Sequence, residues 1–283
     1  MTGHRHLLND RPPELPAELL EAVASPGGGR IVLVLGAGCS GERPTDLPLA
    51  GDLARECHRR LLADGRLADG AVGNPDDLSA VAAAVFEATG SQRDLVERFP
   101  PDRFRNAEPN DGYLIAAAFL RESAVSCVMT LNFDVAASTA LAHLGTREEV
   151  STIGGPEDHH RLGARNLIYL HRNINSEPDE LILRREALDE EWRDHWEEVV
   201  ARRVLGGPVT VFVGLGSPAA VLVETTRRIL AALEVGARVY VVDPLERERS
   251  AFFAALDLDP RVYVRLGWSE FMHRLAGAAM AWR

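Results

Sequence analysis

The chain has 283 residues, of which 46% are hydrophobic and 26% charged, and its formal net charge is -11. This composition is ordinary for a globular chain with a large core, and the negative charge disfavours nucleic acid as a direct partner, because no gathering of basic residues offsets it. No stretch reads as a signal peptide or a bilayer-spanning segment, so we expect a cytoplasmic chain without a membrane partner.

Residues 1–29 predict a short helix and a flexible lead-in that ends in SPGGGR. From residue 30 to 283 we expect one α/β domain. Its strand-free stretch at about 64–108 is expected to form a helical insertion.

Six short runs of β-branched and aliphatic residues predict the strands of a sheet. They begin at residues 30, 124, 166, 209, 238 and 261 and read RIVLVL, AVSCVM, NLIYL, VTVFV, RVYVV and RVYVRL. Most are continuously apolar, as in strands buried on both faces of a parallel sheet. Helical patterns lie between them. The sequence therefore predicts an α/β fold with a doubly wound, mostly parallel, Rossmann-like sheet of about six strands.

The first helix after the opening strand is expected to begin late, because Pro44 and Pro48 follow the glycine-rich loop. Thr45 or Asp46 is predicted to cap this helix, with Pro48 in its first turn. Its apolar stripe consists of Leu49, Leu53, Cys57 and Leu61. Further helices are predicted within 76–99, 110–123, 135–145, 187–205 and 218–233.

Polar and glycine residues follow the predicted strands, at the edge where open parallel sheets bind ligands. The segments after the first five strands are Gly36-Ala37-Gly38-Cys39-Ser40, Thr130-Leu131-Asn132-Phe133-Asp134, His171-Arg172-Asn173, Gly214-Leu215-Gly216-Ser217 and Asp243-Pro244. Two glycine loops, an asparagine, a histidine and an aspartate are therefore expected to converge on one edge.

The glycine loop at 36–41 matches the G-x-G-x-x-G string of dinucleotide-binding proteins, in which backbone N–H groups approach a pyrophosphate. A dehydrogenase needs a helix that begins within this string and a second strand that ends in an acidic residue about 20 residues further on. Here the prolines delay the helix, and no strand is predicted before about residue 124. The dehydrogenase interpretation is therefore disfavoured, and Gly41 is dispensable.

Each motif also has a plain structural interpretation. Asn132 and Asp134 are residue types that cap helices, such as the one expected at 135–145. His171 could be a strand-end histidine in a polar loop, and G-x-G also occurs as turn chemistry. Cys39, Cys57 and Cys127 are scattered without any C-x-x-C pair, and the histidines lack metal-ligand spacing. Neither a zinc ribbon nor another metal site is predicted.

The order of the motifs resembles the sirtuin-like superfamily, and in particular the bacterial sirtuin-like NAD hydrolases of antiphage defence. The resemblance rests on a G-A-G-x-S loop at 36–40, a T-x-N-[FY]-D segment at 130–134, an L-H segment at 170–171 and the late GLGS loop at 214–217. These motifs occur in the family's chain order, and the resemblance extends from about residue 30 to 245.

The resemblance implies that NAD is the substrate, with no other cofactor. Asn132 would hold the nicotinamide ribose and the incoming water, and His171 would act as the general base. Asp134 would support the loop of Asn132. The remaining NAD-binding positions implied by the family are Gly36, Ala37, Gly38, Cys39, Ser40, Gly214, Gly216, Ser217 and Asp243, of which the last would approach the adenosine.

Two departures from the family shape the functional hypothesis. Arg172 replaces the glycine of the family's L-H-G segment, so it either contacts a phosphate or marks a degenerate site. The four-cysteine zinc module of the protein deacetylases is absent, which favours hydrolysis of NAD over deacylation or ADP-ribosyl transfer. The main hypothesis is an NAD hydrolase that releases nicotinamide and ADP-ribose, and the alternative is an NAD- or ADP-ribose-binding regulatory or assembly subunit.

An unregulated NAD hydrolase would harm its own host, so the resemblance also implies a gated effector of antiphage defence. We expect gating by homo-oligomerisation or by a separately encoded sensor or ATPase partner.

Overall fold

The computed structural model describes residues 15–24, 31–196, 199–200, 208–216, 219–233 and 235–281. Seven strands form one sheet in the order β3-β4-β2-β1-β5-β6-β7, and every neighbouring pair is parallel. The strands are β1 (Ile31–Leu35), β2 (Val125–Thr130), β3 (Ser151–Ile153), β4 (Asn166–Tyr169), β5 (Val209–Val213), β6 (Arg238–Asp243) and β7 (Tyr263–Arg265). Apart from the edge strand β3, this is the 3-2-1-4-5-6 order of Rossmann-type sheets. The predicted fold class is confirmed.

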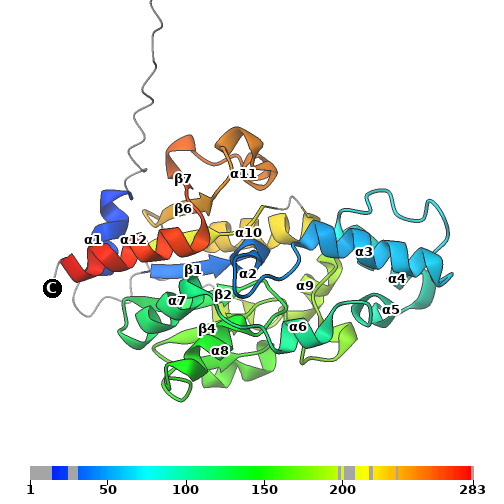
Figure 1. Ribbon diagram of the computed structural model, residues 1–283, viewed down its shortest axis with the longest axis horizontal. Helices are drawn as coiled ribbons and strands as arrows, with labels where there is room; N and C mark the ends of the chain where they lie inside the picture. Colours follow the sequence, from blue (N-terminus) through cyan, green and yellow to red (C-terminus); the bar gives the residue numbers. More distant parts are fainter. Residues whose placement is uncertain are drawn as a thin grey trace, which may run out of the picture.

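Helices cover both faces of the sheet (Figure 1). One face carries α1 (Ala17–Ala24), α7 (Asp111–Arg121), α8 (Ala136–His143) and α12 (Trp268–Ala281). The other face carries α9 (Arg185–Glu191), α10 (Ala220–Ala232) and α11 (Ala251–Leu256). Short 3-10 turns complete the connections: η1 (Pro156–Arg161), η2 (Pro178–Glu180), η4 (Arg247–Arg249) and η5 (Pro260–Val262).

The central strand β1 explains why the strands are continuously apolar. Successive side chains of a strand point to opposite faces of the sheet. Ile31, Leu33 and Leu35 belong to the core on the side of α7 and α12, whereas Val32 and Val34 belong to the core on the side of α10. All five are fully buried, so each position of this strand has to be hydrophobic.

No strand lies between β1 and β2, a stretch that is described throughout, and four helices lie between α2 (Ala37–Gly41) and α7. After the one-turn α2, they are α3 (Ala50–Ala63), α4 (Leu78–Thr89), α5 (Arg93–Val96) and α6 (Pro101–Arg105). Figure 1 shows α3, α4 and α5 extending beyond the carboxyl end of β1, on the right of the view. This stretch includes the insertion expected at about 64–108. Its division from the rest of the chain stays a prediction.

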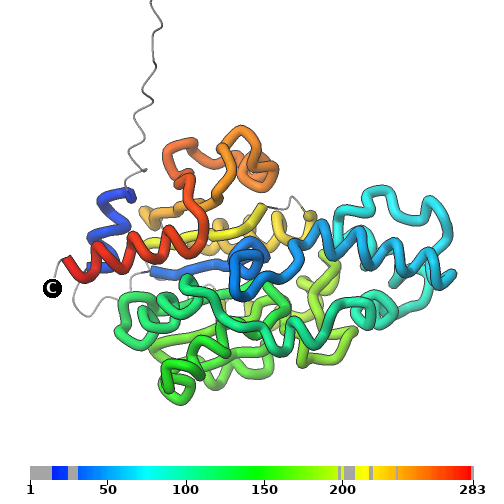
Figure 2. Tube along the Cα trace, viewed as in Figure 1, coloured from blue at the N-terminus to red at the C-terminus, as the bar shows by residue number. Residues whose placement is uncertain are grey.

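The outer end of these helices is held by the segment that follows β4. Asp179 accepts hydrogen bonds from the Ser91 hydroxyl and from the backbone N–H of Gln92. The buried Gln92 carboxamide donates in turn to the carbonyls of Pro178 and Leu181. The tube in Figure 2 shows these two parts of the chain, far apart in sequence, side by side on the right. These hydrogen bonds hold the helices beside the 178–183 segment, so that both parts of the chain line the same cavity.

The prediction that the prolines delay the first helix is wrong. A one-turn helix, α2 (Ala37–Gly41), begins within the glycine loop, with Gly36 as its N-cap. The longer α3 begins only at Ala50, after Leu49, so neither Thr45 nor Asp46 caps it and Pro48 precedes it. The Thr45 hydroxyl instead accepts from the N–H of Asn110. The other argument against a dehydrogenase holds, because β2 begins only at residue 125.

Three further expectations differ in detail. The edge strand β3 was not predicted, because its sequence, STI, contains no run of aliphatic residues. The helix expected at 76–99 is divided into α4 and α5 at Gly90, which has a positive φ of 74°. The helix expected at 187–205 is regular only as α9, and residues 201–207 lie outside the described part of the chain. Most of the lead-in expected at 1–29 also lies outside it.

Within the described part of the chain, no helix is long and apolar enough to cross a membrane.

Candidate functional site

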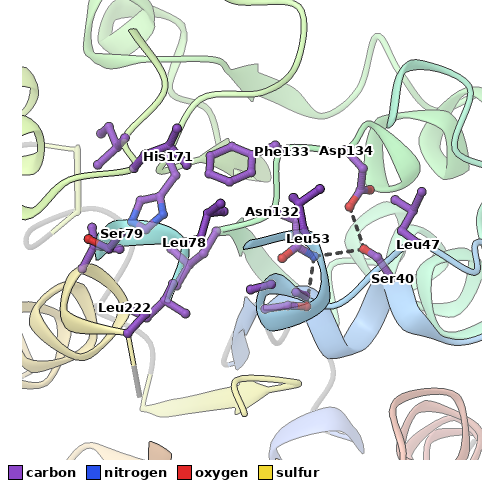
Figure 3. A pocket seen from close by; sticks show the side chains of 18 of the residues that line it. Ser40, Leu47, Leu53, Leu78, Ser79, Asn132, Phe133, Asp134, His171 and Leu222 are labelled. Carbon is purple, nitrogen blue, oxygen red and sulfur yellow. Dashed lines mark hydrogen bonds between the residues drawn. The ribbon is translucent and has the colours of Figure 1, made fainter. Parts of the chain in front are cut away.

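The loops that follow β1, β2 and β4 line a cavity with about 690 Å³ of empty space (Figure 3). The cavity lies at the point where the strand order reverses, since β1 has β2 on one side and β5 on the other. Its polar lining consists of Ser40, Ser79, Asn132, Asp134 and His171. The rest of the lining is mainly aliphatic and aromatic, and comes from α3, α4, α6, α10 and the 182–183 segment.

The glycines of the first loop are required by its contact with the loop after β5. The N–H groups of Gly36 and Gly38 donate to the carbonyls of Val213 and Gly214, each at 2.9 Å. A Cβ atom on Gly36 would come within 2.6 Å of the Gly214 oxygen, and one on Gly38 within 2.9 Å of the Gly214 Cα. These two N–H groups are therefore already used, and Ala37 and Ser40 are the residues of α2 that line the cavity.

A second cavity, of about 720 Å³, lies on the other side of the same loop. Gly38, Gly41 and Gly214 line it, together with residues at the ends of β5 and β6. Leu47 and Pro48 line both cavities. The crevice beyond the strands therefore consists of two spaces separated by the glycine loop.

Three other positions suggested by the family resemblance, Cys39, Gly216 and Asp243, do not line the first cavity. The Cys39 side chain is fully buried, its Sγ lies 3.5 Å from the Val213 carbonyl, and burial raises the pKa of its thiol well above the usual range. Asp243 is buried, and its carboxylate accepts from the Leu245 N–H and the Ser250 hydroxyl. Gly216 is exposed. Ser217 lies outside the described residues.

Asn132 belongs to a buried hydrogen-bond network that joins three elements. Its Nδ2 shares its two protons among three acceptors, the Gly36 carbonyl at 3.0 Å, Ser40 Oγ at 3.1 Å and Tyr113 Oη at 3.2 Å. Ser40 Oγ donates to Asp134 Oδ2 at 2.7 Å, and it lies 2.7 Å from Tyr113 Oη. The N–H of Ala136 donates to the other oxygen of Asp134.

The protons of this network have one consistent arrangement. A hydroxyl has a single proton, and that of Ser40 is given to the Asp134 carboxylate. The Tyr113 hydroxyl therefore donates to Ser40 and accepts from Asn132. Burial raises the pKa of the Asp134 carboxyl, whereas the hydrogen bonds from Ser40 and Ala136 oppose the shift. Because Nδ2 of Asn132 is held by these acceptors, Oδ1 is the atom of the carboxamide that remains to accept from a ligand.

His171 follows β4 and lines the same cavity, across from Asn132 in Figure 3. It is 1% exposed, and burial lowers its pKa to about 3. The imidazole is therefore neutral near pH 7. Its Nε2 lies 3.0 Å from the Thr225 hydroxyl of α10.

Arg172 has a left-handed backbone conformation with φ 65°, which glycine adopts more readily than any other residue. Its guanidinium does not line the cavity. It pairs with Glu157 of η1 and with Glu191 at the end of α9, beside Gly155, where a Cβ atom would overlap it. The arginine thus takes the turn that glycine would take, and His171 keeps its place in the cavity wall.

Three polar residues of the site were not predicted from the sequence: Ser79, which lines the cavity, and Tyr113 and Thr225, which contact Asn132 and His171. Tyr113 belongs to the apolar pattern of α7 and Thr225 to that of α10, so both resemble ordinary helix residues in the sequence. Only their distance from Asn132 and His171 in the folded chain distinguishes them. In the described part of the chain no three His, Cys, Asp or Glu side chains are grouped as metal ligands.

Comparison with solved structures identifies similar folds. A Sir2 homologue in a complex with NAD matches at 16% identity over 96% of this chain and 97% of its own length, with a TM-score of 0.56. A variant Sir2 homologue in a complex with ADP-ribose matches at 16% identity over 94% and 97%, with a TM-score of 0.52. The chain has the fold of the Sir2 homologues. No family model and no curated protein sequence matches it.

The buried histidine of this Sir2-like fold predicts a pH dependence of stability. In the unfolded chain His171 has a pKa near ~6.5, whereas in the folded chain its pKa is about 3. Below pH 6.5 the unfolded chain therefore binds a proton that the folded chain does not, and stability is lost as the pH falls towards 3. We expect His171 to account for a slope of ~1 kcal/mol per pH unit in the unfolding free energy between pH 6 and 4.

Urea unfolding of the His171→Gln variant at several pH values measures this contribution. Its slope should be flatter than that of the unchanged chain, and the exposed His143→Gln on α8 should leave the slope as it is. Equal slopes in the His171→Gln variant and the unchanged chain would contradict the assignment of a neutral, buried imidazole.

The Tyr113 hydroxyl should stabilise the loops after β1 and β2. Tyr113→Phe removes its bonds to Ser40 and Asn132 inside the core, so we expect a loss of about 1–2 kcal/mol of unfolding free energy. Tyr240→Phe is the control, because that hydroxyl makes a long, part-buried contact of 3.5 Å with Glu18 and lies outside the network. Thermal unfolding compares the two variants, and an equal effect of both would argue against a stabilising network.

Proposed function

We propose that this protein is an NAD hydrolase that cleaves the bond between nicotinamide and ribose to give nicotinamide and ADP-ribose. The observation that carries the proposal is the pairing of Asn132 and His171 in one cavity, at the carboxyl ends of β2 and β4. An asparagine and a neutral histidine supply an acceptor and a base, which are the groups that this reaction requires. The NAD and ADP-ribose complexes of Sir2 homologues with the same fold support the choice of ligand.

For this reaction the protein has to position NAD and the attacking water and to supply a proton acceptor. Nicotinamide leaves as a neutral molecule with the bonding electron pair, and the ribose carbon becomes oxocarbenium-like. Water then attacks that carbon, while Asn132 Oδ1 accepts a hydrogen bond from the water or a ribose hydroxyl. As the new C–O bond forms, the water gives one proton to His171 and from there to solvent, and its other proton stays on the new hydroxyl of ADP-ribose. An imidazole of low pKa is a weak base, which suits an electrophile that water attacks readily.

The two cavities support an extended ligand. The first contains Asn132 and His171 and would take the nicotinamide ribose, and the second, across the glycine loop, would take the adenosine. The diphosphate would then cross near Ala37 and Ser40. Since the N–H groups of Gly36 and Gly38 are bonded to the loop after β5, these two glycines contribute shape and not donors.

The position of Arg172 bears on the alternative of a degenerate, regulatory subunit. That alternative depended on the loss of the family's glycine after His171. The arginine keeps the left-handed turn and directs its charge to Glu157 and Glu191, which supports an intact site. Deacylation and ADP-ribosyl transfer lack a corresponding observation in their favour.

Incubation of the pure protein with NAD, with nicotinamide followed by chromatography, tests the proposal. His171→Ala should lower turnover by roughly 10²–10⁴-fold, the usual contribution of a positioned general base, and Asn132→Ala should also lower turnover, because the water or the ribose hydroxyl loses its acceptor. His143→Ala, on the exposed side of α8, is the control and should keep full activity. Tight binding of ADP-ribose in calorimetry without any turnover would instead support the regulatory subunit.

We further propose that turnover is gated, as an effector of antiphage defence would require, by self-assembly or by a separate sensor or ATPase partner. If self-assembly is the gate, specific activity should rise with protein concentration, in step with a larger mass in light scattering. A monomer with constant specific activity over the whole range would exclude self-assembly and leave the partner.

A further inference from the structure

Thr225 lies on α10, on the opposite face of the sheet from Tyr113, and it contacts the histidine of the site. Its side chain is fully buried. Oγ1 lies 3.0 Å from His171 Nε2 and 2.7 Å from the carbonyl oxygen of Val221, one turn earlier in the helix. The apolar pattern of α10 predicts that this position is buried against the sheet, but it does not predict either of these hydrogen bonds.

The single proton of the Thr225 hydroxyl decides how the histidine is protonated. A carbonyl oxygen only accepts, so at 2.7 Å the hydroxyl donates to Val221. Thr225 Oγ1 must then accept from His171, and the donor is Nε2–H. In a neutral imidazole with a proton on Nε2, the lone pair is on Nδ1.

A threonine that bonds the carbonyl four residues back is common in helices and needs no functional explanation. The neighbouring Thr226 provides the comparison. It is buried to the same extent, and its Oγ1 has no hydrogen-bond partner among the described residues. The two adjacent threonines therefore differ in one respect that matters here, which is the contact of Thr225 with the imidazole.

We propose that Thr225 is a positioning residue that fixes the ring orientation and the tautomer of His171, so that Nδ1 is the basic nitrogen of the site. The proposal rests on the proposed function, since it names the atom of His171 that takes the proton. Thr225 acts through His171, and it does not line the cavity itself. Burial supports the arrangement, because it keeps the imidazole neutral, so that only one of its ring nitrogens carries a proton.

The tautomer can be measured without any reaction. Histidine-selective ¹⁵N NMR at pH 7, with the His171 signals assigned through His171→Gln, should show the Nε2–H form in the unchanged chain. Thr225→Val keeps the shape of the side chain and removes the hydroxyl, so the Nε2–H form should lose its dominance. Thr225→Ser restores the hydroxyl and should restore the tautomer, whereas Thr226→Val should change neither.

Kinetics give the second readout. Replacement of the carboxylate partner of a catalytic histidine costs ~10⁴-fold in kcat in the serine proteases, and a neutral hydroxyl should matter less, so we expect ~10-fold or more for Thr225→Val. The loss should fall on kcat with KM unchanged, and Thr225→Ser should recover most of it. Thr226→Val should hydrolyse NAD like the unchanged chain.

The outcomes separate the two proposals. If NAD is hydrolysed and Thr225→Val changes neither the tautomer nor kcat, the role of Thr225 is wrong while the proposed function stands. If the unchanged chain releases no nicotinamide under any condition, the proposed function fails, and the tautomer by NMR still decides whether Thr225 orients His171. An Nδ1–H form in the unchanged chain would overturn the inference.

Discussion

The buried hydrogen bond from Ser40 to Asp134 is the contact on which the proposed site depends. It joins the loop after β1 to the loop after β2, and Tyr113 and Asn132 attach to it as further members of the same network. The hydroxyl groups of Ser40 and Tyr113 each have one proton to donate. Because the Asp134 carboxylate only accepts, Ser40 donates to Asp134 and Tyr113 donates to Ser40. A polar network of this kind is stable in a core only when every member has a partner. Its consequence is that the Asn132 carboxamide has one orientation.

His171 is held by a separate set of contacts, from the other face of the sheet. Thr225 reaches its ring from α10, and Arg172 ties the following turn to η1 and α9. The two proposed reacting groups are thus placed by different layers of the fold and meet only at the edge of the sheet. This arrangement explains how an arginine replaces a glycine beside the histidine. The backbone takes the left-handed turn, and the long side chain finds its partners outside the cavity.

The glycine loop after β1 was predicted correctly as a motif, but its glycines serve a different contact from the predicted one. In the sequence, Gly36 and Gly38 indicate a backbone that a pyrophosphate can approach closely. In the folded chain, the space beside them is taken by Gly214 and Leu215, and their N–H groups bond to the loop after β5. The same chemistry, a backbone without Cβ atoms, serves the contact between two loops. Sequence alone does not distinguish these uses, because both need the same residue.

The sequence by itself determined the class of the fold. Strands buried on both faces must be continuously apolar, and this requirement makes β1, β2, β4, β5 and β6 visible as runs of aliphatic residues. It also placed Asn132 and His171 at strand ends, because the carboxyl ends of parallel strands share one edge. The tertiary structure alone decided the partners of these residues. Tyr113 and Thr225 lie 19 residues before Asn132 and 54 residues after His171. Both residues belong to helices, and the hydrophobic pattern of a helix predicts which side chains are buried but not which hydrogen bonds they make. Only the packing of these helices on the sheet brings the two hydroxyl groups to the site.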